Sequence, residues 1–380
     1  MAEHNDSHIS PCSGVSDDPA YLSTQLITYI GNKRALISHI GKIVETVKKR
    51  LGKDRLRIFD AFSGSGVVSR YFKGHADYLA ANDIEDYAAV TSSCYLRNKS
   101  SVDMRYLEEL CAELNIKVES DSFQPGFIEE LYAPADDDLI TAQDRVFYTR
   151  LNARRLDNYC RMIEAVPVEY RDLLLGPLLS KASVHANTAG VFKGFYKDRQ
   201  TKTGRFGGTN SDALSRIKRN IFIEPPVLSR FDCDVNVLQE DANTAVRMQS
   251  DLDLAYFDPP YNQHPYGSNY FMLNLLVNYQ RPRQISKISG IPVDWKRSDY
   301  NVRSRSLPRL KDLFEHTDAR FLLVSFNDEG FVHPDEMRQT LDELGRVEVI
   351  KAPYNTFRGS RNLRNRGIHV TEQLFLVERA

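Results

Sequence analysis

The sequence lacks the features that mark membrane and secreted proteins. No apolar run among its 380 residues approaches the ~20 residues that span a bilayer. The first residues do not form a basic-then-apolar leader, so we expect a cytoplasmic protein without membrane contacts. The five cysteines are odd in number and widely spaced, with no Cys-x-x-Cys pair. This pattern argues against a disulfide framework and against a zinc or other metal site.

A strong net charge is also absent, since the formal charge is −1. The composition, 42% hydrophobic and 27% charged, is typical of a globular chain with one large or two ordinary domains. The basic residues are nevertheless clustered between Arg281 and Lys311 and between Pro353 and Val370. Such clusters are either solvated surface or phosphate contacts. Their positions on both sides of a candidate active site favour phosphate contacts, and the candidates are Arg297, Arg303, Arg358 and Arg361.

The candidate active site follows the apolar run Leu252–Phe257, which predicts a buried strand. Asp258, Pro259, Pro260 and Tyr261 come directly after it, where ligands bind in open α/β sheets. The prolines have no backbone donors, so Asp258 and the proline carbonyls can only accept hydrogen bonds. These acceptors and the face of Tyr261 suit an exocyclic amine on a flat ring. The alternative is an ordinary proline turn with a packed tyrosine.

A second motif indicates a cofactor site. The strand ending at Asp60 runs into Phe62, Gly64 and Gly66, where small residues allow a ligand close to the backbone. Asp83 follows the next predicted strand, about 20 residues later, where an acid can accept both hydroxyls of a ribose. The pair predicts an adenosine-containing cofactor. Because the third glycine of a dinucleotide fingerprint is absent, S-adenosylmethionine is favoured over a dinucleotide.

Three further segments fit around these motifs. A turn containing Gly31 and Asn32 opens a predicted helix of about twenty residues, and its N-terminus suits an anion such as a carboxylate. Asp241 follows another strand and either binds the adenine amino group or caps the next helix. The segment 262–271 is rich in small and aromatic residues, and we expect it to form part of the pocket wall.

The middle of the chain carries no such motif. Helical periodicity is present at 145–166 and 172–185, and a basic, aromatic and glycine-rich segment at 191–208 predicts an exposed hairpin or long loop. Its basic residues are Lys193, Lys197, Arg199, Lys202 and Arg205, with Phe195, Tyr196 and Phe206 between them. Either these residues contact nucleic acid, with the aromatic rings as wedges, or this is a surface hairpin with a packed aromatic core. Near the end, 346–350 and 373–377 are typical of an antiparallel strand pair.

Taken together, the motifs resemble the D12 class of DNA adenine-N6 methyltransferases, the family of the Dam enzymes and many type II modification methylases. Tyr29, Gly31 and Lys33 match its N-terminal cofactor motif, and Asp258 to Tyr261 match its Asp-Pro-Pro-Tyr. Asp60-Ala61 replaces the more usual Glu-Pro before the glycines. The resemblance implies these cofactor-binding residues: Tyr29, Lys33, Asp60, Phe62, Gly64, Gly66, Asp83 and Asp241. It also suggests that Lys33 contacts the flipped base or its neighbour.

The family implies an α/β fold: a Rossmann-like S-adenosylmethionine-dependent methyltransferase sheet with an inserted, mainly helical target-recognition region. We expect a disordered tail at 1–24, a cofactor-binding part at 25–95, the insertion at 96–233 and an active-site part at 234–380. The implied cofactor is S-adenosylmethionine, and the implied partner is double-stranded DNA.

The implied reaction is methylation of N6 on a flipped adenine. The implied setting is a prokaryotic or phage-type cytoplasm, where a cognate restriction endonuclease acts separately. The oligomeric state is open. Two alternatives are methylation of an RNA base or protein amide, and an inactive nucleic-acid-binding module. Asp258, where an asparagine would favour the first, and the intact cofactor motifs argue against both.

Overall fold

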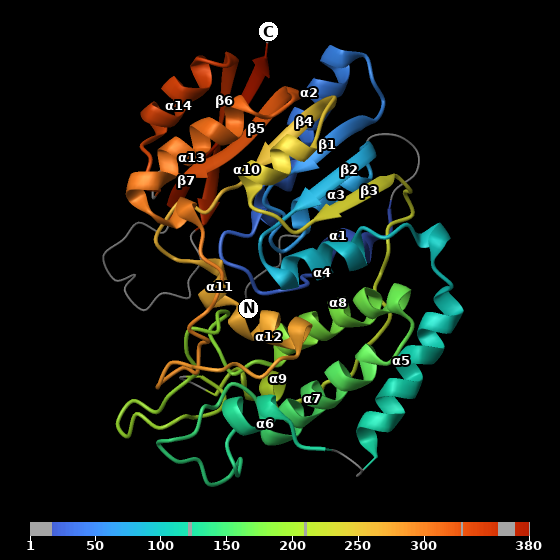
Figure 1. Cartoon of the computed structure of the whole chain (residues 1–380), viewed down its shortest axis with the longest axis vertical. Helices are drawn as coiled ribbons and strands as arrows, with labels where there is room; N and C mark the ends of the chain where they lie inside the picture. Colours follow the sequence, from blue (N-terminus) through green and yellow to red (C-terminus); the bar gives the residue numbers. More distant parts are fainter. Residues whose placement is uncertain (1–16, 121–123, 209–210, 328–329, 356–368, 380) are drawn as a thin grey trace.

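The computed structural model describes residues 17–120, 124–208, 211–327, 330–355 and 369–379. In this part of the chain seven strands form one sheet in the order β3-β2-β1-β4-β5-β7-β6 (Figure 1). The strands are β1 (Leu56–Asp60), β2 (Ala76–Asn82), β3 (Asp234–Leu238), β4 (Leu252–Phe257), β5 (Ala319–Asn327), β6 (Gly345–Asn355) and β7 (His369–Arg379). Strands β1 to β5 pair in parallel, whereas β7 is antiparallel to β5 and β6. The carboxyl ends of the parallel strands therefore share one edge, and the predicted Rossmann-like α/β sheet is confirmed.

The central strand β4 shows why the sheet is covered on both faces. All six of its residues are buried. Because alternate side chains point to opposite faces, Leu254 and Tyr256 join one apolar core, and Ala255 and Phe257 join the other. A continuous apolar run, rather than an alternating one, is what a strand buried on both faces requires.

Helices supply both cores. The α-helices are α1 (Pro19–Ser23), α2 (Ile37–Leu51), α3 (Val67–Lys73), α4 (Asp86–Tyr95), α5 (Met104–Glu119), α6 (Phe127–Tyr132), α7 (Arg150–Glu164), α8 (Val168–His185), α9 (Leu214–Lys218), α10 (Ala242–Ala245), α11 (Tyr266–Asn269), α12 (Phe271–Asn278), α13 (Arg303–Glu315) and α14 (Pro334–Asp342). Short 3₁₀ turns are η1 (Lys33–Leu36), η2 (Lys99–Ser101), η3 (Val246–Met248) and η4 (Asp299–Asn301). Helices α2 and α3 pack on one face of the sheet, and α10, α13 and α14 pack on the other. No helix among the described residues has the length and apolar character needed to cross a membrane.

A helical region lies beside the sheet, in the lower half of the view in Figure 1. Helices α5 to α9 share a third apolar core with α4 and with α12. Helix α12 belongs to the segment 234–380, which we expected to form only the active-site part. Its residues Phe271, Met272 and Leu276 are instead buried in the helical core. The chain segment that follows Asp258 thus connects the sheet to the helical region.

The predicted tail is partly ordered. Residues 1–16 lie outside the described part of the chain, but α1 forms within the segment that we expected to be disordered. The Asp18 side chain accepts a hydrogen bond from the Ala20 N–H at 2.9 Å, and Pro19 occupies the first helical position. Tyr21 is 1% exposed, and its hydroxyl donates to the Tyr95 carbonyl at 2.8 Å. One buried ring therefore fixes a segment whose composition is otherwise polar.

Candidate active site

The polar residues predicted from the motifs meet at the carboxyl edge of the parallel strands. They line a cleft that, with the open solvent at its mouth, encloses about 850 Å³ of empty space. Residues from the ends of β1, β2 and β4 form its floor, and residues 29–33, Tyr266 and 296–301 contribute to its walls. Of the predicted residues, Tyr29, Lys33, Asp60, Phe62, Gly64, Asp83, Asp241, Asp258 and Pro260 line this cleft.

The glycine turn after β1 is shaped for close approach of a ligand. Gly64 and Gly66 have φ values of +49° and +73°, which disfavour residues with a side chain. A Cβ atom on Gly64 would lie 3.0 Å from the Tyr29 ring. Asp83 at the end of β2 holds the turn, because its carboxylate accepts the N–H groups of Gly64 at 2.8 Å and Glu85 at 2.9 Å.

Asp60, which replaces the usual glutamate, makes hydrogen bonds to the glycine turn and to the helix that follows it. Its carboxylate is fully buried and accepts hydrogen bonds from the Ser69 hydroxyl at 2.5 Å and the Phe62 N–H at 3.4 Å. Burial raises the pKa of Asp60 to about 7, although these two hydrogen bonds oppose the rise. Direct contact with a cofactor stays a prediction for this residue.

Three tyrosines fix the N-terminal motif above the cleft. Tyr29 stacks on Tyr266 and Tyr270, with ring centroids 5.0 and 4.8 Å away. The Tyr270 hydroxyl accepts the Ile30 N–H at 2.8 Å, and the Tyr266 hydroxyl donates to the Ile30 carbonyl at 3.2 Å. The segment 262–271, predicted as a pocket wall, thus contributes Tyr266 to the lining and holds the backbone of the opposite wall.

Asp258 lies beside a buried cation. Lys33 Nζ is 3.0 Å from Asp258 Oδ1 and 3.0 Å from Oε1 of Glu372 on β7. Burial raises the pKa of Asp258 to about 6; the Lys33 ammonium opposes the rise and the Glu372 carboxylate adds to it. Burial alone would lower the pKa of Lys33, yet the neighbouring carboxylates raise it well above its usual value. At neutral pH the site therefore holds a mostly ionised Asp258 beside a lysine cation.

The predicted contact of Lys33 with the flipped base or its neighbour stays a prediction. Lys33 is 2% exposed and both its charge partners are protein carboxylates. Sequence reasoning missed Glu372 altogether, although a charged residue at the start of a predicted apolar strand was a signal. It also missed Glu85, which lines the cleft, accepts a hydrogen bond from Asn274 at 2.6 Å and has a pKa that burial raises to about 7.

Tyr261 packs near Lys33 and Phe326. Its ring makes an edge contact with Phe326, at 5.6 Å between centroids, and lies 5.5 Å from Lys33 Nζ. Its carbonyl accepts the Phe331 N–H at 2.8 Å, so its backbone is fixed. Pro259 is buried and Pro260 lines the cleft. The acceptor Asp258, the two prolines and the Tyr261 ring therefore follow one another at the end of β4, as the motif predicts.

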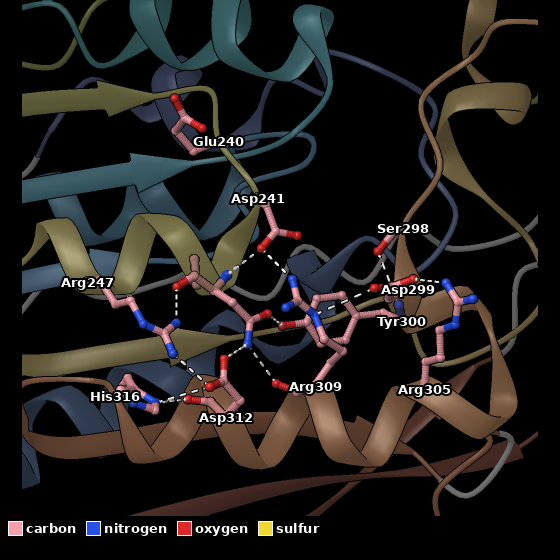
Figure 2. Close-up of polar contacts among 12 residues, drawn as sticks. Glu240, Asp241, Arg247, Ser298, Asp299, Tyr300, Arg305, Arg309, Asp312 and His316 are labelled. Atoms are coloured by element: carbon pink, nitrogen blue, oxygen red, sulfur yellow. Dashed lines mark hydrogen bonds and ion pairs between the residues drawn. The ribbon is translucent and has the colours of Figure 1, made fainter.

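Asp241 caps α10, as the alternative reading of the sequence had it. Its carboxylate accepts from the Asn243 N–H at 3.1 Å and from Arg309 at 2.6 Å (Figure 2). In the same network the Tyr300 hydroxyl donates to Asn243 at 2.5 Å, and the Tyr300 ring meets Phe62 edge-on at 5.3 Å. Because Asp241 also lines the cleft, the cap does not remove it from the candidate cofactor site.

The predicted DNA-contacting residues are distributed over the surface. Arg297, Arg303, Lys193, Arg199, Lys202 and Arg205 are exposed, and Lys197 is half-buried. None of these seven forms an ion pair with another described residue, whereas Lys296, Arg305 and Arg309 are paired with acids. Arg358 and Arg361 lie outside the described residues. Phe195 and Phe206 are each 8% exposed and pack in the helical core, which fits the alternative of a hairpin with a packed aromatic core.

The cleft fits S-adenosylmethionine. Gly64 and Asp83 both line the cleft beside the end of β1, and the lack of a side chain on Gly64 lets the Tyr29 ring pack against the turn. Phe62 and Tyr300 supply apolar surface near Asp241 for a flat ring. When bound, this cofactor supplies an electrophilic methyl group on a sulfonium.

Comparisons with known proteins agree with this site. The model of the D12 class N6 adenine-specific DNA methyltransferases matches residues 29–340, including the middle segment for which the motifs gave no match. The chain is 26% identical over 361 residues to the type II methyltransferase M.NlaIII of Neisseria lactamica, covering 93% of this chain and 99% of that protein. It is 28% identical over 357 residues to the type II methyltransferase M.CviAII of Paramecium bursaria Chlorella virus 1, covering 92% and 98%. The modification methylase StsI of Streptococcus sanguinis is 26% identical over 377 residues, which cover 92% of this chain and 52% of that protein.

Among solved structures, a putative class I S-adenosylmethionine-dependent methyltransferase from Listeria monocytogenes matches 91% of this chain and 59% of its own. The identity is 10% and the TM-score 0.32, too low to carry an argument. The family model, by contrast, spans most of the chain. The chain therefore belongs to the D12 class of N6 adenine-specific DNA methyltransferases, with S-adenosylmethionine as its methyl donor and DNA as its substrate.

Proposed function

We propose that the chain methylates N6 of an adenine rotated out of double-stranded DNA, with Asp258 and the carbonyl of Pro259 accepting the two amine hydrogens. The observation that supports this most directly is the contact between Lys33 Nζ and Asp258 Oδ1, which leaves Oδ2 for the amine. Both acceptors attract the amine hydrogens, so electron density shifts toward nitrogen and the lone pair is localised toward the methyl group. Holding nitrogen, methyl carbon and sulfur in line supplies most of the acceleration.

Tyr261 receives the flipped base. Extruding a base costs a few kcal/mol, and stacking on an aromatic ring returns ~1–3 kcal/mol. The ring can serve this role because Phe326 and the backbone bond to Phe331 hold it in place. Stacking thus offsets much of the cost of opening the duplex.

We place the DNA along two neighbouring turns. One closes with the Arg205 N–H donating to the Tyr196 carbonyl at 2.9 Å, and Arg199 and Lys202 are exposed at its tip. The other closes between Gln284 and Val293. The Ser289 hydroxyl donates to the Lys193 carbonyl at 2.7 Å and joins the two turns. Exposed cations without acidic partners among the described residues suit phosphate contacts, and this helical region suits target recognition.

We also infer that the chain is the modification enzyme of a type II system, because two of the relatives are type II methyltransferases and a third is a modification methylase. A cognate restriction endonuclease would act as a separate protein. Long-read sequencing of host DNA that reports methylated bases would give the target sequence. Protection of that DNA from a nuclease cutting the same sequence would support the pairing.

The mechanism is tested with purified protein, labelled S-adenosylmethionine and duplex DNA, followed by mass spectrometry of the nucleosides. We expect N6-methyldeoxyadenosine from the wild type and none from Asp258→Ala, with nearly unchanged cofactor binding. Asp253→Asn is a matched control, because Asp253 lies at the other end of β4 and pairs with Lys53. Methyl groups on cytosine, or adenine methylation by Asp258→Ala, would contradict the proposal.

A further inference from the structure

The Lys33 ammonium connects two carboxylates that come from two strands of the sheet separated by β5. Asp258 follows the central strand β4, whereas Glu372 belongs to β7 and is fully buried. Each carboxylate has an oxygen 3.0 Å from Lys33 Nζ. The Ser325 hydroxyl on β5 donates to the same oxygen, Glu372 Oε1, at 2.9 Å and helps to fix the carboxylate. The three charged groups carry one net negative charge when all are ionised.

Glu372 is not a satisfied structural anchor. Its second carboxylate oxygen, Oε2, is buried and has no hydrogen-bond partner among the described residues. A buried acceptor without a partner costs stability, so an aliphatic side chain would serve better if packing were the only demand. Glu372 also lies beyond residues 29–340, the range matched by the family model. Its place next to the Lys33–Asp258 pair therefore calls for a functional reason.

We propose that Glu372 is a positioning residue for methylation: through Lys33 it sets the place and the acceptor strength of the Asp258 carboxylate. This inference rests on the proposed role of Asp258. With Glu372 present, the charge of Lys33 is shared between two anions. Without it, the whole positive charge acts on Asp258 and makes that carboxylate a weaker acceptor for the amine hydrogens.

The net negative charge also suits the reaction. The bond from N6 to the methyl carbon forms as the bond from that carbon to sulfur breaks, and the positive charge moves from sulfur to N6. N6 then loses one proton to Asp258. A preorganised negative site beside the nitrogen stabilises this developing charge. A neutral site, made of Asp258 and Lys33 alone, would do so less well.

The groups that face Asp258 allow the effect of Glu372 to be traced. Besides Lys33 and Glu372, they are Tyr256 on β4, Tyr261, Tyr266 on α11 and Asp60 on β1. Burial raises the pKa values of Tyr256 and Tyr266 well above their usual value, so both stay neutral in the working range. Burial brings the pKa of Asp60 to about 7, and the Asp258 carboxylate adds to this rise. A change at Glu372 therefore acts on Asp258 directly and on Asp60 through Asp258.

The test measures single-turnover methylation of duplex DNA from pH 5 to 9. We expect Glu372→Gln to lower the rate at pH 8 about ten- to hundredfold and to move the acid limb of the rate profile to lower pH. Lys33→Met should move that limb to higher pH. Cofactor affinity should stay within about twofold of the wild type in Glu372→Gln, because Glu372 is outside the cleft lining. The matched control is Glu378→Gln, on the same strand, where the acid pairs with Arg50 and Arg346 at the surface and neither rate nor limb should change.

Opposite displacements of the acid limb are the signature that a merely structural role would not give. An unchanged rate in Glu372→Gln, or a lower rate with the limb in its wild-type place, would overturn the inference. If Glu372→Gln fails to fold, Glu372→Asp and Ser325→Ala replace it. Glu372→Asp should leave the acid limb of the rate profile at its wild-type pH, and Ser325→Ala should move it partway to lower pH. The reverse pattern would overturn the inference. A wild-type protein that left adenine unmethylated would overturn the proposed function itself.

Discussion

Replacement of Lys33 by methionine is the most informative change in the structure. It removes the cation 3.0 Å from both Asp258 and Glu372 and keeps a side chain of similar length. Breaking a buried ion pair by removing one partner costs about 3–5 kcal/mol of unfolding free energy. That cost is limited here, because Asp258 has a pKa of about 6 even beside the lysine and takes up a proton more readily without it.

The loss of stability in Lys33→Met should therefore depend on pH. A carboxyl group whose pKa is higher in the folded than in the unfolded protein binds a proton on folding, so stability falls as pH rises until the folded pKa is passed. In the wild type this fall ends near pH 6 for Asp258. In the variant it continues above pH 6, by up to ~1.4 kcal/mol per pH unit. Since the pKa of Lys33 is raised above its usual value, its own contribution stays constant over this range.

We expect the difference in unfolding free energy between wild type and Lys33→Met to grow by up to about 2.7 kcal/mol from pH 6 to pH 8. Urea unfolding at pH 6, 7 and 8 measures this difference. Lys117→Met is the matched control, because Lys117 pairs with Glu113 at the surface and should contribute less than ~1 kcal/mol at every pH. An equal loss at pH 6 and pH 8 would refute the electrostatic reasoning.

Three further predictions concern the base, the cofactor and the DNA. Tyr261→Ala should lower kcat/KM about ten- to hundredfold, as expected for a lost stacking energy of ~1–3 kcal/mol. Unchanged kinetics would show that the ring does not stack on the base. Gly64→Ala should cost about 1–2 kcal/mol of stability from its positive φ and also weaken cofactor binding in calorimetry. Gly52→Ala, with φ +65° and no atom within 4 Å of its Cβ position, should show the strain alone; equal cofactor affinities in the two variants would argue against the glycine turn. Replacing Arg199 and Lys202 by alanine should lower the slope of log affinity against log salt by about two, and an unchanged slope would place the DNA elsewhere.

Local sequence patterns were sufficient to predict the sheet. The continuous apolar run Leu252–Phe257 correctly indicated a buried strand, and the pair 346–350 and 373–377 correctly indicated antiparallel strands. The predicted helix after Gly31 is present as the 3₁₀ turn η1 followed by α2. The spacing of apolar residues and the residue preferences of turns depend on residues that are close in the sequence, which explains why these predictions were correct.

The missed features depend on contacts between distant parts of the chain. Nothing near Glu372 shows that Lys33 will lie beside it, because strand order alone brings β7 next to β5 and within reach of η1. Polar composition likewise hid the buried Tyr21 of α1. For Phe195 and Phe206 the sequence left open whether the rings contact nucleic acid or pack inside, and contacts with distant residues place them in the helical core.

The place of β7 has a consequence for synthesis of the protein. Among the described residues β6 pairs only with β7, and β7 separates it from β5, so residues 345–355 have no neighbour in this sheet until residues 369–379 have left the ribosome. Until then the nascent chain exposes open strand edges that can pair with other chains. Methylation competence should arise in one step, when β7 joins the sheet and delivers Glu372.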